Sequence, residues 1–292
     1  MIRVFSFILY KFLFFFDFLL KKLSGRSFLI WFKDFIEADA YKKIYFHKEI
    51  KLFTPNYLTN WLADDFFYKE PETIQWIDNF QKFKITKKII FWDVGANIGI
   101  YSLYAGKKYK KIDIVSFEPS TSNLRILSRN ISINNLEKKI KIFQIPLGNE
   151  KHSFGVFKES KFAEGESLNS YGSNLDFEGK KINAENKYQI YGSNINQLIK
   201  DGVVPVPNFL KIDVDGLEHL ILKGASKVLK NNNLKSISIE LNENYKNQFN
   251  QDMKIMKKSG FTYIAKKRNE NFPLYKYKKF RKIFNYYFEK KL

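Results

Sequence analysis

Five short runs rich in β-branched and aromatic residues alternate with helical patterns through the second part of the chain. They occupy residues 89–94, 112–117, 140–145, 209–214 and 236–241. Nearly continuous apolar runs of this length, each followed by turn residues and a helical stretch, are typical of parallel strands covered by helices on both faces. The pattern therefore predicts a doubly wound α/β domain.

The third and fourth runs are more than sixty residues apart, about twice the spacing of an ordinary strand–helix–strand unit. We expect an insertion at residues 151–208, with strand-like pieces at 154–157 and 188–191. It leaves from the carboxyl ends of the strands, where open α/β sheets bind ligands, so we expect it to cover the substrate. Beyond the fifth run, residues 261–267 and 272–277 are predicted to form a closing antiparallel hairpin.

The two ends of the chain have their own patterns. Apolar and polar residues alternate at helical spacing over residues 28–80, which predicts an N-terminal helical region over residues 1–85. The α/β domain is expected over residues 86–292. Residues 276–292 interleave cations and aromatics, and we expect a solvated helix end there.

The first twenty residues are strongly apolar, but Arg3, Lys11 and Asp17 interrupt them. A spanning helix needs about 20 mostly uncharged residues, so the pattern favours an amphipathic helix. Such a helix could lie on an anionic inner-membrane surface or pack on the rest of the protein, and both interpretations stay open. The segment lacks a small-residue cleavage site, so we expect a cytoplasmic protein, peripheral on the inner membrane surface under the first interpretation.

The net charge of +20, from 50 basic and 30 acidic residues, suggests a nucleic acid as partner. Only six of the cations are Arg, however, and phosphate and base recognition favour Arg over Lys. An excess of Lys, Ile and Asn is also typical of AT-rich coding sequence, so nucleic acid is disfavoured. The chain has no Cys, which excludes disulfides, thiolate metal sites and cysteine nucleophiles.

The first strand of the series ends in Asp93 and continues into a glycine-rich turn, GANIG at residues 95–99. Glycine permits close backbone approach to a ligand, and the helix N-terminus that follows favours a negative group. Asn97 breaks the dinucleotide-binding spacing, and no P-loop lysine follows. The turn predicts a nucleotide-type site of another kind.

Acidic residues follow two other predicted strands. Glu118, followed by Pro119, lies some twenty residues past the glycine turn, where a carboxylate can accept hydrogen bonds from a ribose diol. Asp213, Asp215 and Glu218 end the fourth strand at the same sheet edge and could remove a proton, position an acceptor or bind a divalent cation. Alternatively, Asp215 begins a turn and Glu218 caps the next helix.

Six segments carry a family resemblance. They are KEPETIQWI (69–77), FWDVGANIGIYSLYA (91–105), VSFEPSTSNLRILSRNISIN (115–134), IPLGNE (145–150), FLKIDVDGLEHLILKGA (209–225) and SISIEL (236–241). In this order they resemble the FkbM family of S-adenosylmethionine-dependent methyltransferases. The resemblance implies a Rossmann-like class I methyltransferase with a seven-stranded, mostly parallel sheet, and methyl transfer to a hydroxyl oxygen.

The resemblance also implies roles for individual residues. Asp93, Gly95, Asn97 and Gly99 would contact the methionine end of the cofactor, and Glu118 with Pro119 its ribose. Pro146 and Leu147 would border the adenine. The chain departs from the family in having Asp215 where Glu is usual, and Asn196 in place of an acidic residue.

We expect methylation of a hydroxyl on a glycan or lipid-linked saccharide. Asp213, Asp215, Glu218 or His219 could take the proton, with Asp213 favoured, and a divalent metal is possible without being indicated. Aromatic residues of the insertion could stack on a sugar or pack internally; they are Tyr171, Phe177, Tyr188 and Tyr191. The alternatives are an RNA ribose methyltransferase and a non-catalytic, membrane-associated module that binds the cofactor.

Overall fold

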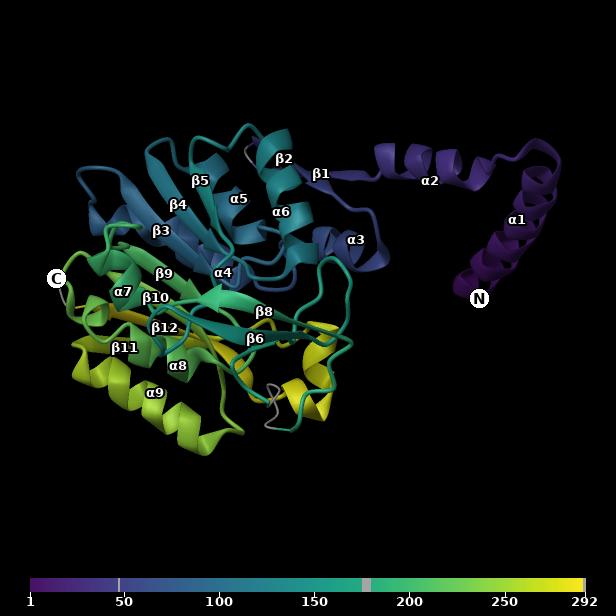
Figure 1. Ribbon diagram of the computed structural model, residues 1–292. Coiled ribbons are helices and arrows are strands. Elements are labelled where there is room, and N and C mark those ends of the chain that lie inside the picture. The colour runs from purple at the N-terminus through teal and green to yellow at the C-terminus, as the bar shows by residue number, and fades with distance from the viewer. Residues whose placement is uncertain (47, 175–179, 291–292) are drawn as a thin grey trace.

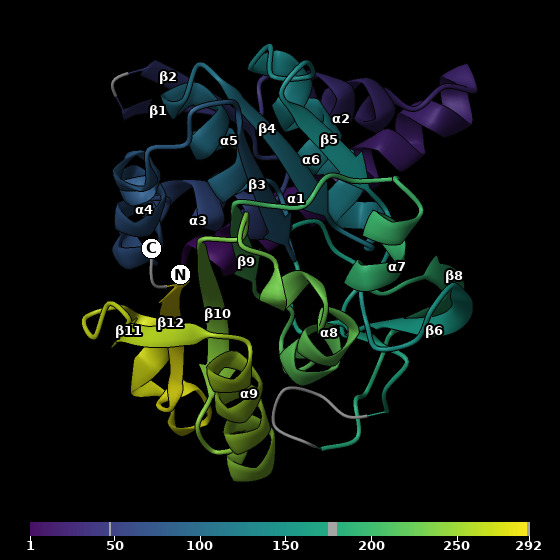
Figure 2. The same cartoon turned by 90° about the vertical axis from the view of Figure 1, so that its left-hand side faces the viewer.

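A seven-stranded sheet, in the order β11-β12-β10-β9-β3-β4-β5, forms the centre of the computed structural model, which describes residues 1–46, 48–174 and 180–290 (Figures 1 and 2). Its strands are β3 (Ile89–Val94), β4 (Ile112–Phe117), β5 (Ile140–Phe143), β9 (Phe209–Ile212), β10 (Ser236–Asn242), β11 (Phe261–Lys267) and β12 (Ile283–Lys290). Strands β10, β9, β3, β4 and β5 are parallel neighbours, and β12 is antiparallel to both β10 and β11. The predicted Rossmann-like α/β sheet is confirmed.

Helices cover both faces of this sheet. Successive residues of a strand point to opposite faces, and in the buried strands both sets are apolar, so each face packs against helices. Phe91 packs with α4 (Pro71–Asp78), α5 (Ile100–Lys108) and α6 (Thr121–Ile133). Trp92 packs on the other face with α7 (Ile195–Lys200), α8 (Glu218–Gly224) and α9 (Lys246–Lys258). Both rings are fully buried, so the continuous apolar runs reflect a sheet that is covered on both faces.

The N-terminal region is only partly helical, which corrects the prediction for residues 28–80. Helices α1 (Ile2–Ser24), α2 (Phe28–Ala38) and α3 (Tyr57–Asp64) are present, but β1 (Tyr41–Phe46) and β2 (Lys48–Phe53) form an antiparallel pair. Strand β2 is held against α6, where Asn130 Oδ1 accepts the N–H of Phe53 at 2.8 Å. Ile50 and Leu52 are fully buried there. The predicted division of the chain at residue 85 stays a prediction.

Helices α1 and α2 extend away from the rest of the molecule (Figure 1). Among the helices that the structure describes, none combines the length and apolar character needed to cross a bilayer.

The insertion contains a three-stranded antiparallel sheet in the order β7-β6-β8, built from β6 (Ser153–Glu159), β7 (Ser170–Tyr171) and β8 (Asn186–Gly192). The C-terminal hairpin is present, but its second strand was predicted wrongly. Strand β11 pairs with β12, not with residues 272–277, where the chain makes a 3₁₀ turn over Pro273–Lys276. The basic, aromatic C-terminal segment therefore forms a strand, with Tyr286, Tyr287 and Phe288 buried, and not a solvated helix end.

Candidate active site

A cavity of about 340 Å³ opens at the carboxyl ends of β3, β4 and β9. Strand β3 lies between β4 and β9, so the strand order reverses here. Open α/β sheets bind ligands at such a reversal. The cavity is lined by the predicted residues Gly95, Asn97, Glu118, Pro119, Pro146, Leu147, Asp213 and Asp215.

The glycine turn lies against the end of β9. Gly95 has φ +83°, and a Cβ there would come within 1.8 Å of the carbonyl oxygen of Asp213. Asn97 also has a positive φ, and its Nδ2 donates to the carbonyl oxygens of Gly165 and Glu166, both at 3.2 Å. Its Oδ1 is buried without a hydrogen-bond partner among the described residues. The turn therefore offers an unused acceptor at the cavity wall.

Two predicted residues lie behind the cavity wall and are not among the described residues that line it. Asp93 is fully buried, and its Oδ2 accepts from Ser102 Oγ of α5 at 2.7 Å. Gly99 packs on α6, where a Cβ would meet Leu127 Cδ1 at 2.5 Å. These residues fix α5 and α6 to the sheet and so support the glycine turn from below.

Glu118 connects the glycine turn to the end of β4. One carboxylate oxygen accepts the N–H of Asn97 at 2.8 Å, and the other accepts the N–H of Ser120 at 2.9 Å. The residue is 4% exposed. Burial raises its pKa to about 7, although both backbone donors favour the ionised form. The side chain of Asn123 also hydrogen-bonds to this carboxylate, which leaves one of its four acceptor positions for a ligand hydroxyl.

A partly buried charge cluster lines and adjoins the cavity around Asp213 and consists of Lys69, Glu70, Lys211, Asp213 and Glu240. Lys211 Nζ is 2.6 Å from Asp213 Oδ2, and Lys69 Nζ is 3.3 Å from Glu70 Oε1. Lys211 and Glu70 are each 1% exposed.

The charges in this cluster shift the pKa values of its acids in opposite directions. Burial alone would raise the pKa of Glu70, but the charges of Lys69 and Lys211 lower it to about 2. Burial, and then the carboxylates of Asp213 and Asp215, raise the pKa of Glu240 well above its usual value. One carboxylate oxygen each of Glu70, Asp213 and Glu240 lies within 4.8 Å of the other two. Lys69 and Lys211 supply the positive charge that a bound metal ion would otherwise have to supply beside these carboxylates.

The remaining predicted acids have different surroundings. Asp215 has φ +57°, and its Oδ2 accepts the N–H of Leu168 at 2.8 Å. Burial, together with the charge of Asp213, raises the pKa of Asp215 to about 6. Glu218 Oε1 accepts the N–H groups of Val214 and Gly216 in the preceding turn, both at 3.2 Å. Helix α8 starts at Glu218 with Leu217 as its N-cap residue and no side-chain cap hydrogen bond, so the structure does not confirm the alternative that Glu218 caps this helix.

Glu218 and His219 are not among the described residues that line the cavity. Burial raises the pKa of Glu218 to about 8 and lowers the pKa of His219. The structure therefore brings Asp213 and Asp215 together at the cavity and separates them from the other two candidates.

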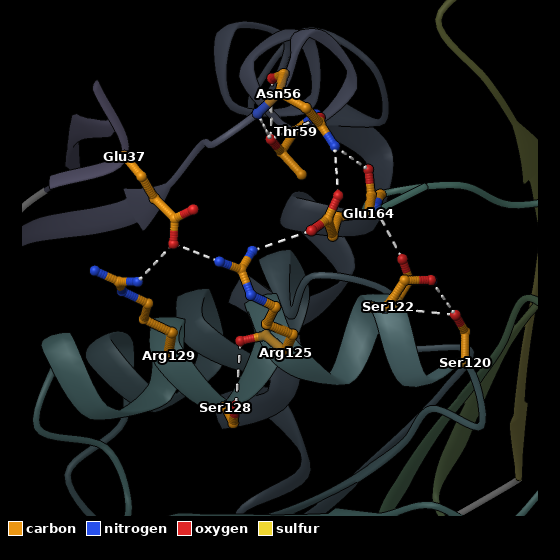
Figure 3. Close-up of polar contacts among 11 residues, drawn as sticks. Glu37, Asn56, Thr59, Ser120, Ser122, Arg125, Ser128, Arg129 and Glu164 are labelled. Carbon is orange, nitrogen blue, oxygen red and sulfur yellow. Dashed lines mark hydrogen bonds and ion pairs between the residues drawn. The ribbon is translucent and has the colours of Figure 1, made fainter. Parts of the chain in front are cut away.

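Residues 163–169 of the insertion are called the strap here, and residues 165–169 of it form one side of the cavity. Asn123 on α6 accepts the N–H of Gly165 at 2.8 Å and donates to Glu166 O at 3.0 Å. On the outer side, Glu164 accepts from Arg125 at 3.0 Å and from Asn56 Nδ2 at 3.0 Å (Figure 3). Together with the contacts to Asn97 and Asp215, these bonds hold the strap beside the glycine turn.

Several cavity residues were missed by the sequence analysis. Lys211 carries a signal, since it is a charged residue within the otherwise apolar strand β9. Glu240 is the one charged residue of β10, which also contains Ser and Asn, so its signal is weaker. Lys69 carries no such signal. Of the aromatic residues considered, Tyr171 lines the cavity, Tyr188 donates to Pro119 O and Tyr191 is exposed; Phe177 lies outside the described residues.

Comparisons with known proteins agree with this architecture. Residues 93–263 match the family model described as the methyltransferase FkbM domain. Methyltransferase sdnD of Sordaria araneosa is 27% identical over 154 residues, which cover 46% of this chain and 60% of that protein. Hexuronic acid methyltransferase AglP of Haloferax volcanii is 26% identical over 158 residues, which cover 51% and 55%.

The chain thus spans 55–60% of the length of these two curated relatives. A crystal structure of precorrin-6y C5,15-methyltransferase from Geobacter metallireducens aligns with a TM-score of 0.42 and 10% identity, over 76% of this chain and 87% of that one. Because the family model matches more than half of its residues, the chain belongs to the FkbM methyltransferase family.

Proposed function

We propose that the protein transfers a methyl group from S-adenosylmethionine to a hydroxyl oxygen of a glycan or lipid-linked saccharide. The observation that carries the proposal is the single cavity that Glu118, the glycine turn and Asp213 share. Family membership supports the reaction class. The name of one relative, a hexuronic acid methyltransferase, supports a saccharide as acceptor.

The residues at one end of the cavity fit this cofactor. Glu118 lines the cavity and keeps an acceptor position beyond its bonds to Asn97, Ser120 and Asn123, which suits a ribose hydroxyl. Asn97 Oδ1 is a buried acceptor without a hydrogen-bond partner among the described residues, which suits the ammonium group of the methionine part. Pro146 and Leu147 offer apolar surface for the adenine. When bound, the cofactor supplies an electrophilic methyl group.

Asp213 is the proposed proton acceptor. Lys211 holds one of its oxygens at 2.6 Å, which leaves the other for an acceptor hydroxyl. Asp215 is assigned a positioning role, because it binds the N–H of Leu168 in the strap. The strap would exclude water and help to orient the acceptor, and such orientation can contribute about 7 to 11 kcal/mol to the lowering of a barrier.

Glu218 and His219 are left out of the proposed mechanism because they lie away from the cavity. A divalent metal is not part of it either, since Lys69 and Lys211 already balance the acids. The proposal includes the predicted location at the inner membrane surface, which suits an acceptor carried on a lipid.

The experiment is to incubate the purified protein with methyl-labelled S-adenosylmethionine and separate host fractions of lipid-linked glycan, polysaccharide and RNA. We expect label in a glycan fraction, and incorporation about 100-fold slower or less when Asp213→Asn replaces the parent protein. Label confined to RNA would instead establish the ribose methyltransferase that the charge of +20 suggests. Cofactor binding without label in any fraction would favour the non-catalytic module.

A further inference from the structure

Helices α1 and α2 form a pair that is closed by one acidic side chain, and this pair is called the helix pair below. Gly25, with φ +70°, ends α1 and turns the chain. Asp17 on α1 then accepts the N–H groups of Phe28 and Leu29, at 2.7 and 3.2 Å, and so caps the N-terminus of α2. Asp17 is 7% exposed. Asp17, the acid that interrupts the apolar pattern of the first twenty residues, therefore binds the N-terminus of α2 and does not face solvent.

The outer surface of the helix pair is apolar and exposed. A stripe along α1 follows steps of three and four residues, which places its members on one helix face. Its members, 41–67% exposed, are Phe5, Ile8, Phe12, Phe15 and Leu19. On α2, Trp31 and Phe35 are 64% and 66% exposed. Soluble proteins rarely leave so large a continuous apolar surface in water, and such surfaces mark interaction sites.

The charges around this surface are mostly positive. The cations of the helix pair are Arg3, Lys11, Lys21, Lys22, Arg26 and Lys33. Its acids are Asp17, Asp34 and Glu37. Asp17 caps α2, and Glu37 forms ion pairs with Arg125 and Arg129 of α6 (Figure 3). The outward charge is therefore cationic, and it complements a negatively charged partner.

We infer that the helix pair lies in the surface of an anionic lipid bilayer, with the stripe of α1 and the aromatic side chains of α2 immersed below the headgroups. Apolar side chains flanked by cations are what an interfacial helix requires. A second copy of the chain fits less well, because its cations would face those of the first. Methyl transfer need not be assumed for this inference, which specifies the contacts behind the proposed location.

The helix pair is also connected to the cavity. Glu37, at the end of α2, pairs with Arg125, and Arg125 pairs with Glu164 of the strap (Figure 3). Arg125 thus links α2 of the helix pair to the strap through two ion pairs.

The test is vesicle co-sedimentation of the full chain, with phosphatidylcholine vesicles prepared with and without phosphatidylglycerol. The triple variant Phe5→Ser, Phe12→Ser, Phe15→Ser removes the stripe. The matched control replaces three exposed aromatics elsewhere, as Tyr57→Ser, Phe154→Ser, Phe162→Ser. We expect the parent and control proteins to bind anionic vesicles, and the stripe variant to bind roughly 100-fold more weakly or worse.

Tryptophan fluorescence reports the depth of the contact. Of the four tryptophans, all of which the structure describes, Trp31 alone is exposed. Lipids brominated near the headgroup should quench it more strongly than lipids brominated at the chain ends, and Trp31→Phe should remove the quenching.

Equal vesicle binding by the parent and the stripe variant would overturn the inference. So would self-association that the stripe variant abolishes, without any vesicle binding, since the partner would then be a second copy. Thermal melting of each variant establishes that it folds. Vesicle binding and methyl transfer are separate measurements, so a failure of the proposed reaction leaves this result intact.

Discussion

Cofactor binding is expected to strengthen as the pH rises through 7, because of Glu118. Burial raises the pKa of this carboxyl to about 7, while ribose hydroxyls donate to its ionised form. Binding therefore requires loss of the proton below pH 7 and is insensitive to pH well above it. From pH 6 to pH 8 the ionised fraction rises from about 1/11 to about 10/11, so the affinity should rise about tenfold, or about 1.4 kcal/mol.

The assay is isothermal titration calorimetry with 5′-methylthioadenosine, which keeps the ribose and adenine but lacks the amino acid and its titrating groups. Glu118→Gln should weaken binding at pH 8 by about 1 to 3 kcal/mol, because the charged acceptor is lost. Its affinity should not vary between pH 6 and pH 8. Asp215→Asn is the matched control, since it removes a neighbouring acid and should keep the slope.

A parent affinity that is constant from pH 6 to pH 8 would refute the reasoning about ionisation. A slope that survives in Glu118→Gln would assign the titration to another group. Unchanged binding by Glu118→Gln at pH 8 would remove Glu118 from the ribose site.

Three further predictions concern other residues of the catalytic cavity and of the helices around it. Asp213→Asn should lower kcat about 100-fold or more while leaving cofactor affinity nearly unchanged; similar activity in a labelled-methyl assay would exclude its role as proton acceptor. Glu218 and Asp252 have pKa values raised by burial to about 8 and about 7, so the folded state binds more protons than the unfolded state near pH 6, and the Tm should fall from pH 6 to pH 8.5. A Tm that rises over this range would contradict the sign. Gly95→Ala should lower the free energy of unfolding by about 2 kcal/mol or more, measured by urea denaturation, because its Cβ would lie 1.8 Å from Asp213 O; wild-type stability would show that the turn can relax.

The parallel part of the sheet could be predicted because strands buried on both faces need continuous apolar runs, and turn residues mark where each ends. The same signal fails for β12, because residues 283–290 follow a stretch of lysines and resemble the continuation of a basic tail. It fails again at residues 41–53, because β1 and β2 are short and rich in Lys. Their burial depends on α6, which lies some seventy residues further along the chain.

The candidate site, like the fold, could be predicted from the sequence only in part. Glu118 and Asp213 could be placed at one sheet edge because parallel strands align their carboxyl ends. The contacts of Asn97 and Asp215 with the strap could not be predicted, since they join residues that are 47 to 69 positions apart in the sequence. Lys69 reaches the cavity from the segment before α4, and nothing in strand periodicity indicates that approach.

The position of β12 has a consequence for how the chain is made. Strand β12 lies between β10 and β11 and pairs with both, yet it follows them in sequence. During synthesis on the ribosome, β10 must wait with an open edge, and β11 has no neighbour in the sheet, until residues 283–290 emerge. An open strand edge is a template for pairing with another chain. The nascent protein should therefore be most prone to aggregation, and most dependent on chaperones, just before its last strand is translated.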